Sequence, residues 1–204
     1  SKIKVLLAGG IKNLIFVDVK SSRLFVFNNN EGKLKYISDH YVSVGKKGYG
    51  KKFEGDKKTP IGTYFIENKI TTKLPDLYGA GAYSINFPSA YDKLNNFTGS
   101  GIWIHGTPSS TYSRPPQSSD GCIVLSNQDI KMLASILNET GTPVIISDTG
   151  LENISMRDEL EINTVKIEIL NKIQGWRTSW EEKNIDNYLS LYSKKAVYNT
   201  DSYL

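Results

Sequence analysis

The sequence is poor in the residues that build metal centres and disulfides. Its 204 residues include one cysteine, Cys122, and two histidines, His40 and His105. A single cysteine excludes a disulfide within the chain and a cysteine-rich zinc site. Two histidines are too few for a convincing metal cluster. We therefore expect neither a metal nor a cofactor.

Long apolar runs are also missing. The run "VLLAGG" near the start is far too short to span a bilayer, so we expect no transmembrane segment. No signal peptide is recognisable. Because the chain starts at Ser1 without a methionine, we expect a processed or trimmed chain, from which an export signal would have been removed.

The charge balance argues against nucleic acid as a partner. The 25 lysines and arginines exceed the 21 acidic residues by only four. No basic run is dense enough to follow a phosphate backbone. The nearest, "KKGYGKK" at 46–52, contains glycines that favour a mobile loop.

The first 148 residues predict a mainly β fold. Residues 11–66 contain β-rich stretches separated by turn-like segments, which is typical of antiparallel strands. Further strand-like runs are "GIWIHG" at 101–106 and "TPVIIS" at 142–147. One helix is expected at 126–141, with Ser126 as its N-cap and Gly141 at its end. Residues 70–100 and 107–121 predict loops, and loops of that length are usually functional or disordered.

The composition changes after residue 150. Apolar residues spaced three and four apart predict a long amphipathic helix over about 156–183, and "NIDNYLSLYSKKA" at 184–196 favours a second helix. We therefore divide the chain into a domain at 1–150 and a helical tail at 151–204. The tail is either an appendage of the main domain or the start of a truncated second one.

One cysteine and one histidine form the candidate site. His105 ends one β-type run and Cys122 begins another, so two neighbouring strand ends would bring an imidazole against a thiol. An imidazole that deprotonates a thiol makes it a good nucleophile. The Gly106 carbonyl could orient the ring, and amides of Gly121 and Cys122 could face an oxyanion. The alternatives are a buried structural thiol and a histidine that merely ends a strand. His40 is interpreted as structural or solvent-facing.

Two motifs in order carry a family resemblance. "HGT" at 105–107 followed by "SDGCIVL" at 119–125 resembles the signature of the L,D-transpeptidase catalytic domain, the YkuD-type family. "VGKKGYGKKFEGDKKTPIGTYFI" at 44–66 resembles the family's Gly-Lys loop and Thr-Pro-x-Gly motif. The resemblance covers about residues 11–148. It implies a mixed β-sandwich-like fold, with a cleft whose walls would come from 107–119 and 70–100.

The resemblance also implies roles. Cys122 would form a thioester with a peptidoglycan stem peptide, His105 would act as base and then acid, and the Gly106 carbonyl would orient the ring. Gly121 and Cys122 would supply the oxyanion donors. Such a protein would act in the periplasm or the exported cell envelope.

The motif departs from the family pattern at two positions, with Asp120 where His is usual and Val124 where Arg is common. Both departures bear on substrate contacts. The expected substrate-side residues are Ser119, Asp120, Tyr112, Arg114 and Trp103, the last three being also plausible loop or core residues.

Four functions follow from these residues. The first is transpeptidation, in which an amine resolves the thioester, and the second is L,D-carboxypeptidation, in which water does. "GWRTSWEEKNIDNYLSLYS" at 175–193 resembles the first helices of nuclear-transport-factor-like domains, which follow the catalytic domain in a carboxypeptidase subgroup. The third is a catalytically silent wall-binding module, suggested by Asp120 and Val124. The fourth, a thiol protease, is weaker because neither motif resembles such enzymes.

Overall fold

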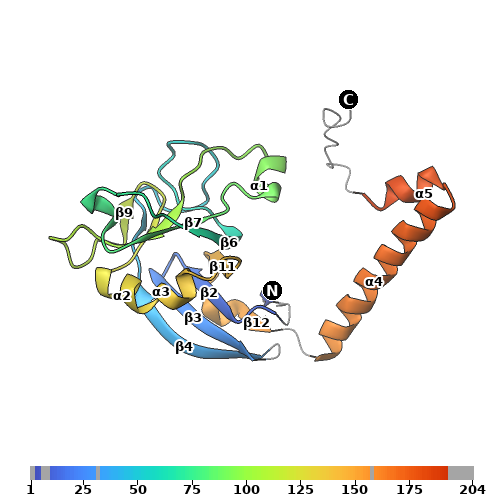
Figure 1. Ribbon diagram of the computed structural model, residues 1–204, viewed down its shortest axis with the longest axis horizontal. Helices are drawn as coiled ribbons and strands as arrows, with labels where there is room; N and C mark the ends of the chain where they lie inside the picture. Colours follow the sequence, from blue (N-terminus) through green and yellow to red (C-terminus); the bar gives the residue numbers. More distant parts are fainter. Residues whose placement is uncertain (1–2, 6–9, 31–32, 157–158, 193–204) are drawn as a thin grey trace. The chain divides into compact units, whose positions relative to one another are not determined.

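The computed structural model describes residues 3–5, 10–30, 33–156 and 159–192 (Figure 1). It divides into two compact units, Ser1–Met156 and Arg157–Leu204. The predicted division lies six residues earlier than the division between these units. Each unit is described by itself below.

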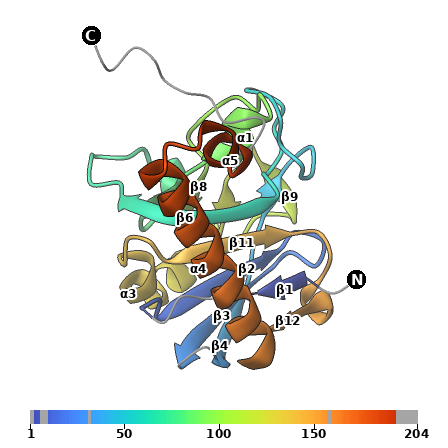
Figure 2. The same cartoon turned by 90° about the vertical axis from the view of Figure 1, so that its right-hand side faces the viewer.

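The first unit is built on one mixed, eight-stranded sheet with the order β10-β8-β7-β6-β11-β2-β3-β4. Figure 2 shows the part from β6 through β11, β2 and β3 to β4. The predicted mainly β fold is confirmed. The strands are β2 (Asn13–Asp18), β3 (Arg23–Asn30), β4 (Lys33–Tyr41), β6 (Gly62–Lys69), β7 (Ala82–Ile85), β8 (Trp103–His105), β10 (Ile123–Val124) and β11 (Pro143–Ser147).

The sequence patterns explain the places of these strands in the sheet. β2 is buried along nearly its whole length, as expected of a strand with neighbours on both sides and covered faces. It pairs antiparallel with β3, which pairs antiparallel with β4, as the 11–66 segment predicts. β11 lies between β2 and β6 and runs parallel to the former and antiparallel to the latter. The apolar core includes Ile15, Val26 and Ile104.

Two short strand pairs complete the unit. β5 (Val44–Gly45) pairs with β9 (Gln117–Ser119), which ties the segment before the lysine-rich loop to the segment before Cys122. β1 (Ile3–Val5) pairs in parallel with β12 (Ile154–Met156), and this pairing was not predicted.

The helices of the first unit differ from the prediction in two segments. The expected helix at 126–141 consists of α2 (Asn127–Met132) and α3 (Ala134–Leu137), with Leu133 between them at ψ 0°. Ser126 caps α2 as predicted, but the second helix ends at Leu137, before Gly141. The loop-rich stretch 70–100 also holds β7, the short helix α1 (Ala90–Leu94) and the 3-10 turn η1 (Asp76–Tyr78). A second 3-10 turn, η2 (Leu151–Asn153), precedes β12.

The second unit contains the two predicted helices, α4 (Glu159–Glu181) and α5 (Ile185–Ser190). Residues 193–196 of the predicted second helix lie outside the described residues. Tyr188 of α5 packs on Trp176 and Trp180 of α4, with ring centroids 5.9 and 5.4 Å apart, and so joins the two helices. Its ring also contacts Tyr192 at 5.0 Å. Several apolar side chains of α4 are exposed, among them Ile167, Leu170 and Ile173. Within the described ranges, no helix combines the length and apolarity needed to cross a membrane.

Candidate active site

The pairing of β8 with β10 places His105 and Cys122 on neighbouring chain segments. In this parallel pair Ile123 is aligned with Ile104 and Val124 with His105. His105 is the last residue of β8, and Cys122 directly precedes Ile123, the first residue of β10, so the two residues stand on adjacent segments at this pair of strands. A hydrogen bond from the Leu125 amide to the His105 carbonyl, 2.9 Å long, fixes this register.

The imidazole of His105 is buried and held in one tautomer. Only 3% of the residue is exposed. Its Nδ1 lies 2.7 Å from the carbonyl oxygen of Gly106. Since a carbonyl can only accept, Nδ1 carries the proton and the neutral ring offers Nε2 as a base. The ring edge also packs on Tyr78, 5.0 Å between centroids at 69°.

The electrostatics keep this imidazole neutral. Burial lowers the pKa of His105 to about 4, and the Arg114 cation acts in the same direction against the hydrogen bond to Gly106. The ring is therefore unprotonated at neutral pH.

The thiol of Cys122 is partly exposed, and its Sγ lies 3.4 Å from the carbonyl oxygen of Gly101. Burial raises the pKa of the thiol, and the nearby Asp120 carboxylate adds to the effect. The Trp103 amide and the cations Arg114 and Lys51 oppose it. The resting site therefore holds a neutral thiol and a neutral imidazole.

Gly106 is required by close packing. A Cβ at this position would lie 2.2 Å from Oδ1 of Asn127. That side chain accepts from the Ala80 amide and donates to the Thr107 carbonyl, both at 2.8 Å. The Gly106 amide donates to the carbonyls of Tyr78 and Gly81. The residue that accepts from the imidazole is thus fixed from several sides.

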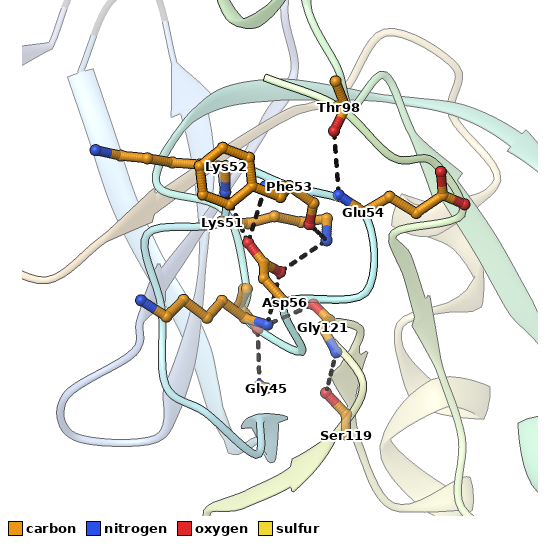
Figure 3. A network of polar contacts seen from close by, with 11 residues as sticks. Gly45, Lys51, Lys52, Phe53, Glu54, Asp56, Thr98, Ser119 and Gly121 are labelled. Atoms are coloured by element: carbon orange, nitrogen blue, oxygen red, sulfur yellow. Dashed lines mark hydrogen bonds and ion pairs between the residues drawn. The ribbon is translucent and has the colours of Figure 1, made fainter. Parts of the chain in front are cut away.

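The turn before Cys122 is tied by Ser119. The Ser119 hydroxyl donates to the Cys122 carbonyl at 2.6 Å. It also accepts from the Gly121 amide at 3.1 Å (Figure 3). Ser119 is buried, so its hydroxyl serves the turn. The Gly121 amide is engaged in this bond, which leaves the Cys122 amide as the better candidate of the two predicted oxyanion donors.

Asp120 projects outward two residues before Cys122. Its carboxylate pairs with Nζ of Lys46 at 2.6 Å and is largely exposed. The hydrogen bond from Lys46 holds the pKa of Asp120 below its usual value. Asp120 therefore places a negative charge on the surface close to Cys122.

The other predicted substrate-side residues differ in their surroundings. Arg114 is half-buried, donates to the Leu77 carbonyl at 3.4 Å, and its charge acts on the pKa values of both His105 and Cys122. Trp103 is half-buried and packs on Tyr78, 5.0 Å between ring centroids. Tyr112 is 77% exposed. Their contacts with a substrate remain predictions.

Four residues that shape the site were not predicted: Tyr78, Lys51, Asp56 and Thr59. Tyr78 packs on both Trp103 and His105. The other three organise the loop behind the Cys122 turn. A threonine before Pro-x-Gly, inside a motif already singled out, is the one sequence signal that could have drawn attention to Thr59.

His40 lies in the fold away from this chemistry. It is 8% exposed, and its ring nitrogens contact Ser38 Oγ at 2.9 Å and Asp129 Oδ1 at 2.7 Å. In the part of the chain that the structure describes, no three His, Cys, Asp or Glu side chains gather as they would around a metal ion.

The comparisons with known proteins point to one family. Residues 12–146 match the model of the YkuD family, the L,D-transpeptidase catalytic domain. No match was found among curated protein sequences.

Two similar solved structures cover nearly the whole chain. One is the helical cell shape determining protein Pgp2 from Campylobacter jejuni, with 24% identity over 98% of this chain and 68% of that one, at a TM-score of 0.76. The other is Bd1075 from Bdellovibrio bacteriovorus, with 31% identity over 95% of this chain and 67% of that one, at a TM-score of 0.65. The chain also covers 64% of the length of a K307A mutant of Pgp2. It therefore spans about two thirds of the length of these relatives.

Proposed function

The chain belongs to the YkuD family of L,D-transpeptidase catalytic domains, and from this we propose that it transfers acyl groups on peptidoglycan stem peptides through Cys122. The attacked bond joins the diamino acid at its L-centre to the terminal D-Ala. The observation that carries the proposal is the pairing of β8 with β10: His105, whose Nδ1 donates to the Gly106 carbonyl, ends one strand, and Cys122 directly precedes the other. A protein with this substrate works in the cell envelope.

In the first half-reaction, Nε2 of His105 accepts the thiol proton as Sγ attacks the carbonyl carbon of the diamino acid. The resulting oxyanion is stabilised by a hydrogen bond from the Cys122 amide. The Gly121 amide already donates to Ser119. Collapse of this intermediate breaks the C–N bond, and the imidazolium gives its proton to the departing amine of D-Ala. A thioester on Cys122 and free D-Ala remain.

In the second half-reaction, His105 accepts a proton from the incoming nucleophile as it attacks the thioester. The C–S bond then breaks and the proton returns to the sulfur. An amine from another stem gives a 3→3 cross-link, which is transpeptidation. Water gives a tripeptide, which is L,D-carboxypeptidation.

The Asp120 carboxylate supports L,D-carboxypeptidation as the second candidate reaction. Asp120 replaces the usual histidine and is paired with Lys46, so the surface beside the thioester differs from the family pattern. The similarity to a protein that determines helical cell shape supports a role in wall remodelling for either reaction.

A digest of purified tetrapeptide muropeptides tests the proposal and separates the two reactions. Tripeptide as the sole product means hydrolysis, and a cross-linked dimer means transfer. We expect Cys122→Ala to abolish both, while the control Lys12→Ala, at an exposed residue paired with Glu139, keeps full turnover.

The same digest distinguishes a catalytically silent wall-binding module. In that case the wild-type protein would bind muropeptides without converting them, and Cys122→Ala would change nothing. That result would overturn the proposed function.

A further inference from the structure

The lysine-rich loop, residues 46–58, is organised around one carboxylate. Asp56 accepts hydrogen bonds from the amides of Lys52, Phe53 and Lys58, at 2.8, 3.0 and 3.1 Å. The Lys51 ammonium adds a fourth at 2.9 Å (Figure 3). A loop with this many bonds to one side chain has a defined conformation despite its glycines.

The Asp56 carboxylate stays ionised throughout the range of pH in which proteins work. Burial raises the pKa of Asp56, but the hydrogen bonds from Phe53, Lys51, Lys52 and Lys58 outweigh burial and hold it at about 2. Lys51 is 5% exposed, and its ammonium is also bound by the Phe53 carbonyl. Removing either partner would leave a charge in a poorly solvated place.

Thr59, at the end of this loop, links it to the nucleophile turn. Its Oγ1 accepts from the Gly45 amide at 2.9 Å and donates its single proton to the Gly121 carbonyl, also at 2.9 Å. The side chain is completely buried. Both hydrogen-bonding functions of one hydroxyl are thus used, one by Gly45 and one by Gly121, which lies 62 positions after Thr59.

The turn also packs directly on the loop backbone. Gly121 has φ +130°, and a Cβ there would lie 2.8 Å from the Lys58 carbonyl oxygen. The residue preceding the nucleophile is therefore held by the loop through a hydrogen bond and through van der Waals contact. Lys58 is in turn held by Asp56.

We infer that Thr59 is a positioning residue: its hydroxyl holds the Gly121 carbonyl and thereby sets the placement of Cys122, with the Asp56-centred loop as its support. The effect on turnover rests on the proposed function. Displacement of a reacting group by about 1 Å can cost about 100-fold in rate, so loss of this bond should lower kcat more than it raises KM.

Two substitutions at Thr59 separate the hydroxyl from the shape of the side chain. Thr59→Val keeps the shape and removes the hydroxyl, and Thr59→Ser keeps the hydroxyl. The matched control is Thr142→Val, which removes another buried threonine hydroxyl, the one that donates to the Ile136 carbonyl. All variants are compared on the full chain, at a temperature where circular dichroism shows them folded.

Two readouts are measured: turnover of purified tetrapeptide muropeptides, and amide hydrogen exchange by NMR. For Thr59→Val we expect kcat to fall about 10- to 100-fold with KM within about threefold. Exchange at the Gly121 amide should accelerate at least tenfold relative to the amides of β2. Thr59→Ser and Thr142→Val should match the wild type in both readouts.

The inference is overturned if Thr59→Val stays within twofold of Thr142→Val in kcat. It is also overturned if exchange at Gly121 rises no more than exchange in β2, because the effect would then be a general loss of stability. If the wild type converts no muropeptide, the proposed function fails, and the exchange data alone decide whether Thr59 holds the turn.

If Thr59→Val does not fold, Asp56→Asn takes its place. It removes the charge and one of the two acceptor oxygens of the side chain, so the bonds from Lys51 and Lys58 to Oδ1 and those from Lys52 and Phe53 to Oδ2 cannot all persist. We expect local acceleration at Gly121 of at least threefold with β2 unchanged, and uniform acceleration would contradict the inference.

Discussion

At the scale of single residues, the pH dependence of the site follows from the burial of His105. With its pKa at about 4, the ring remains an unprotonated base well below the usual histidine range. We predict that kcat/KM on tetrapeptide muropeptides loses half its value only near pH 4. A midpoint between 6 and 7 would mean that the ring is solvated in the working enzyme. Circular dichroism at each pH separates titration from unfolding.

The same shift affects stability, with a sign that can be worked out. Between pH 4 and 6.5, His105 is protonated in the unfolded chain and neutral in the folded protein. Its contribution to the free energy of unfolding therefore rises with pH across that window. It is fully present above 6.5 and is lost as the pH falls towards 4. A shift from 6.5 to about 4 corresponds to on the order of 3 kcal/mol.

Sequence alone was sufficient to select Cys122, His105 and Gly106 as candidates, because they stand in a short motif with fixed spacing. It did not select Thr59 or Tyr78. Their contacts join positions far apart in the chain, and neither apolar periodicity nor charge marks such a contact in advance. Ser119 was expected on the substrate side, whereas its hydroxyl is used by bonds to Gly121 and Cys122.

At the scale of secondary-structure elements, β4 is joined to the start of α2 by a buried polar pair. His40 on β4 contacts Asp129 Oδ1, while Asp129 Oδ2 accepts from the capping Ser126 hydroxyl. The pair therefore fixes α2, the helix that follows β10.

We predict that His40→Ala destabilises the protein by about 1 to 3 kcal/mol, because it leaves a mostly buried carboxylate oxygen without this partner. Urea unfolding measures the change. The control on the same strand is Tyr36→Phe, which removes an exposed hydrogen bond to Asp39 and should stay within about 0.5 kcal/mol. Equal effects of the two substitutions would contradict the structural role of His40.

The interrupted helix shows where element prediction stops. Ile130, Leu133 and Leu137 share one face in both a continuous helix and the observed pair, so the periodicity does not distinguish them. At Leu133 the amide donates to the carbonyls of Asp129 and Lys131, and the backbone departs from helical ψ. The choice depends on packing against the core, which the local sequence does not encode.

At the scale of the whole molecule, the end of the first unit lies at β12. A chain ending at residue 156 keeps the β1–β12 pair, whereas a chain ending at 150 removes β12 and leaves β1 without that partner. We predict that the 1–156 chain melts within a few degrees of the full chain's main transition, and that the 1–150 chain melts lower. Differential scanning calorimetry of the two shortened chains decides between them. Identical melting would show that β12 contributes nothing.

The β1–β12 pair has one more consequence. Ile3 is aligned with Ile154 and Val5 with Met156, so β1 and β12, which lie near the two ends of the first unit, are side by side. A domain whose two ends lie close together can be inserted into a loop of a host protein. It can also be circularly permuted, by joining the two ends with a short linker and opening the chain at another position. Engineered permutants of this kind should retain the arrangement of sulfur and imidazole, since His105 ends β8 and Cys122 directly precedes β10, both remote in sequence from that junction.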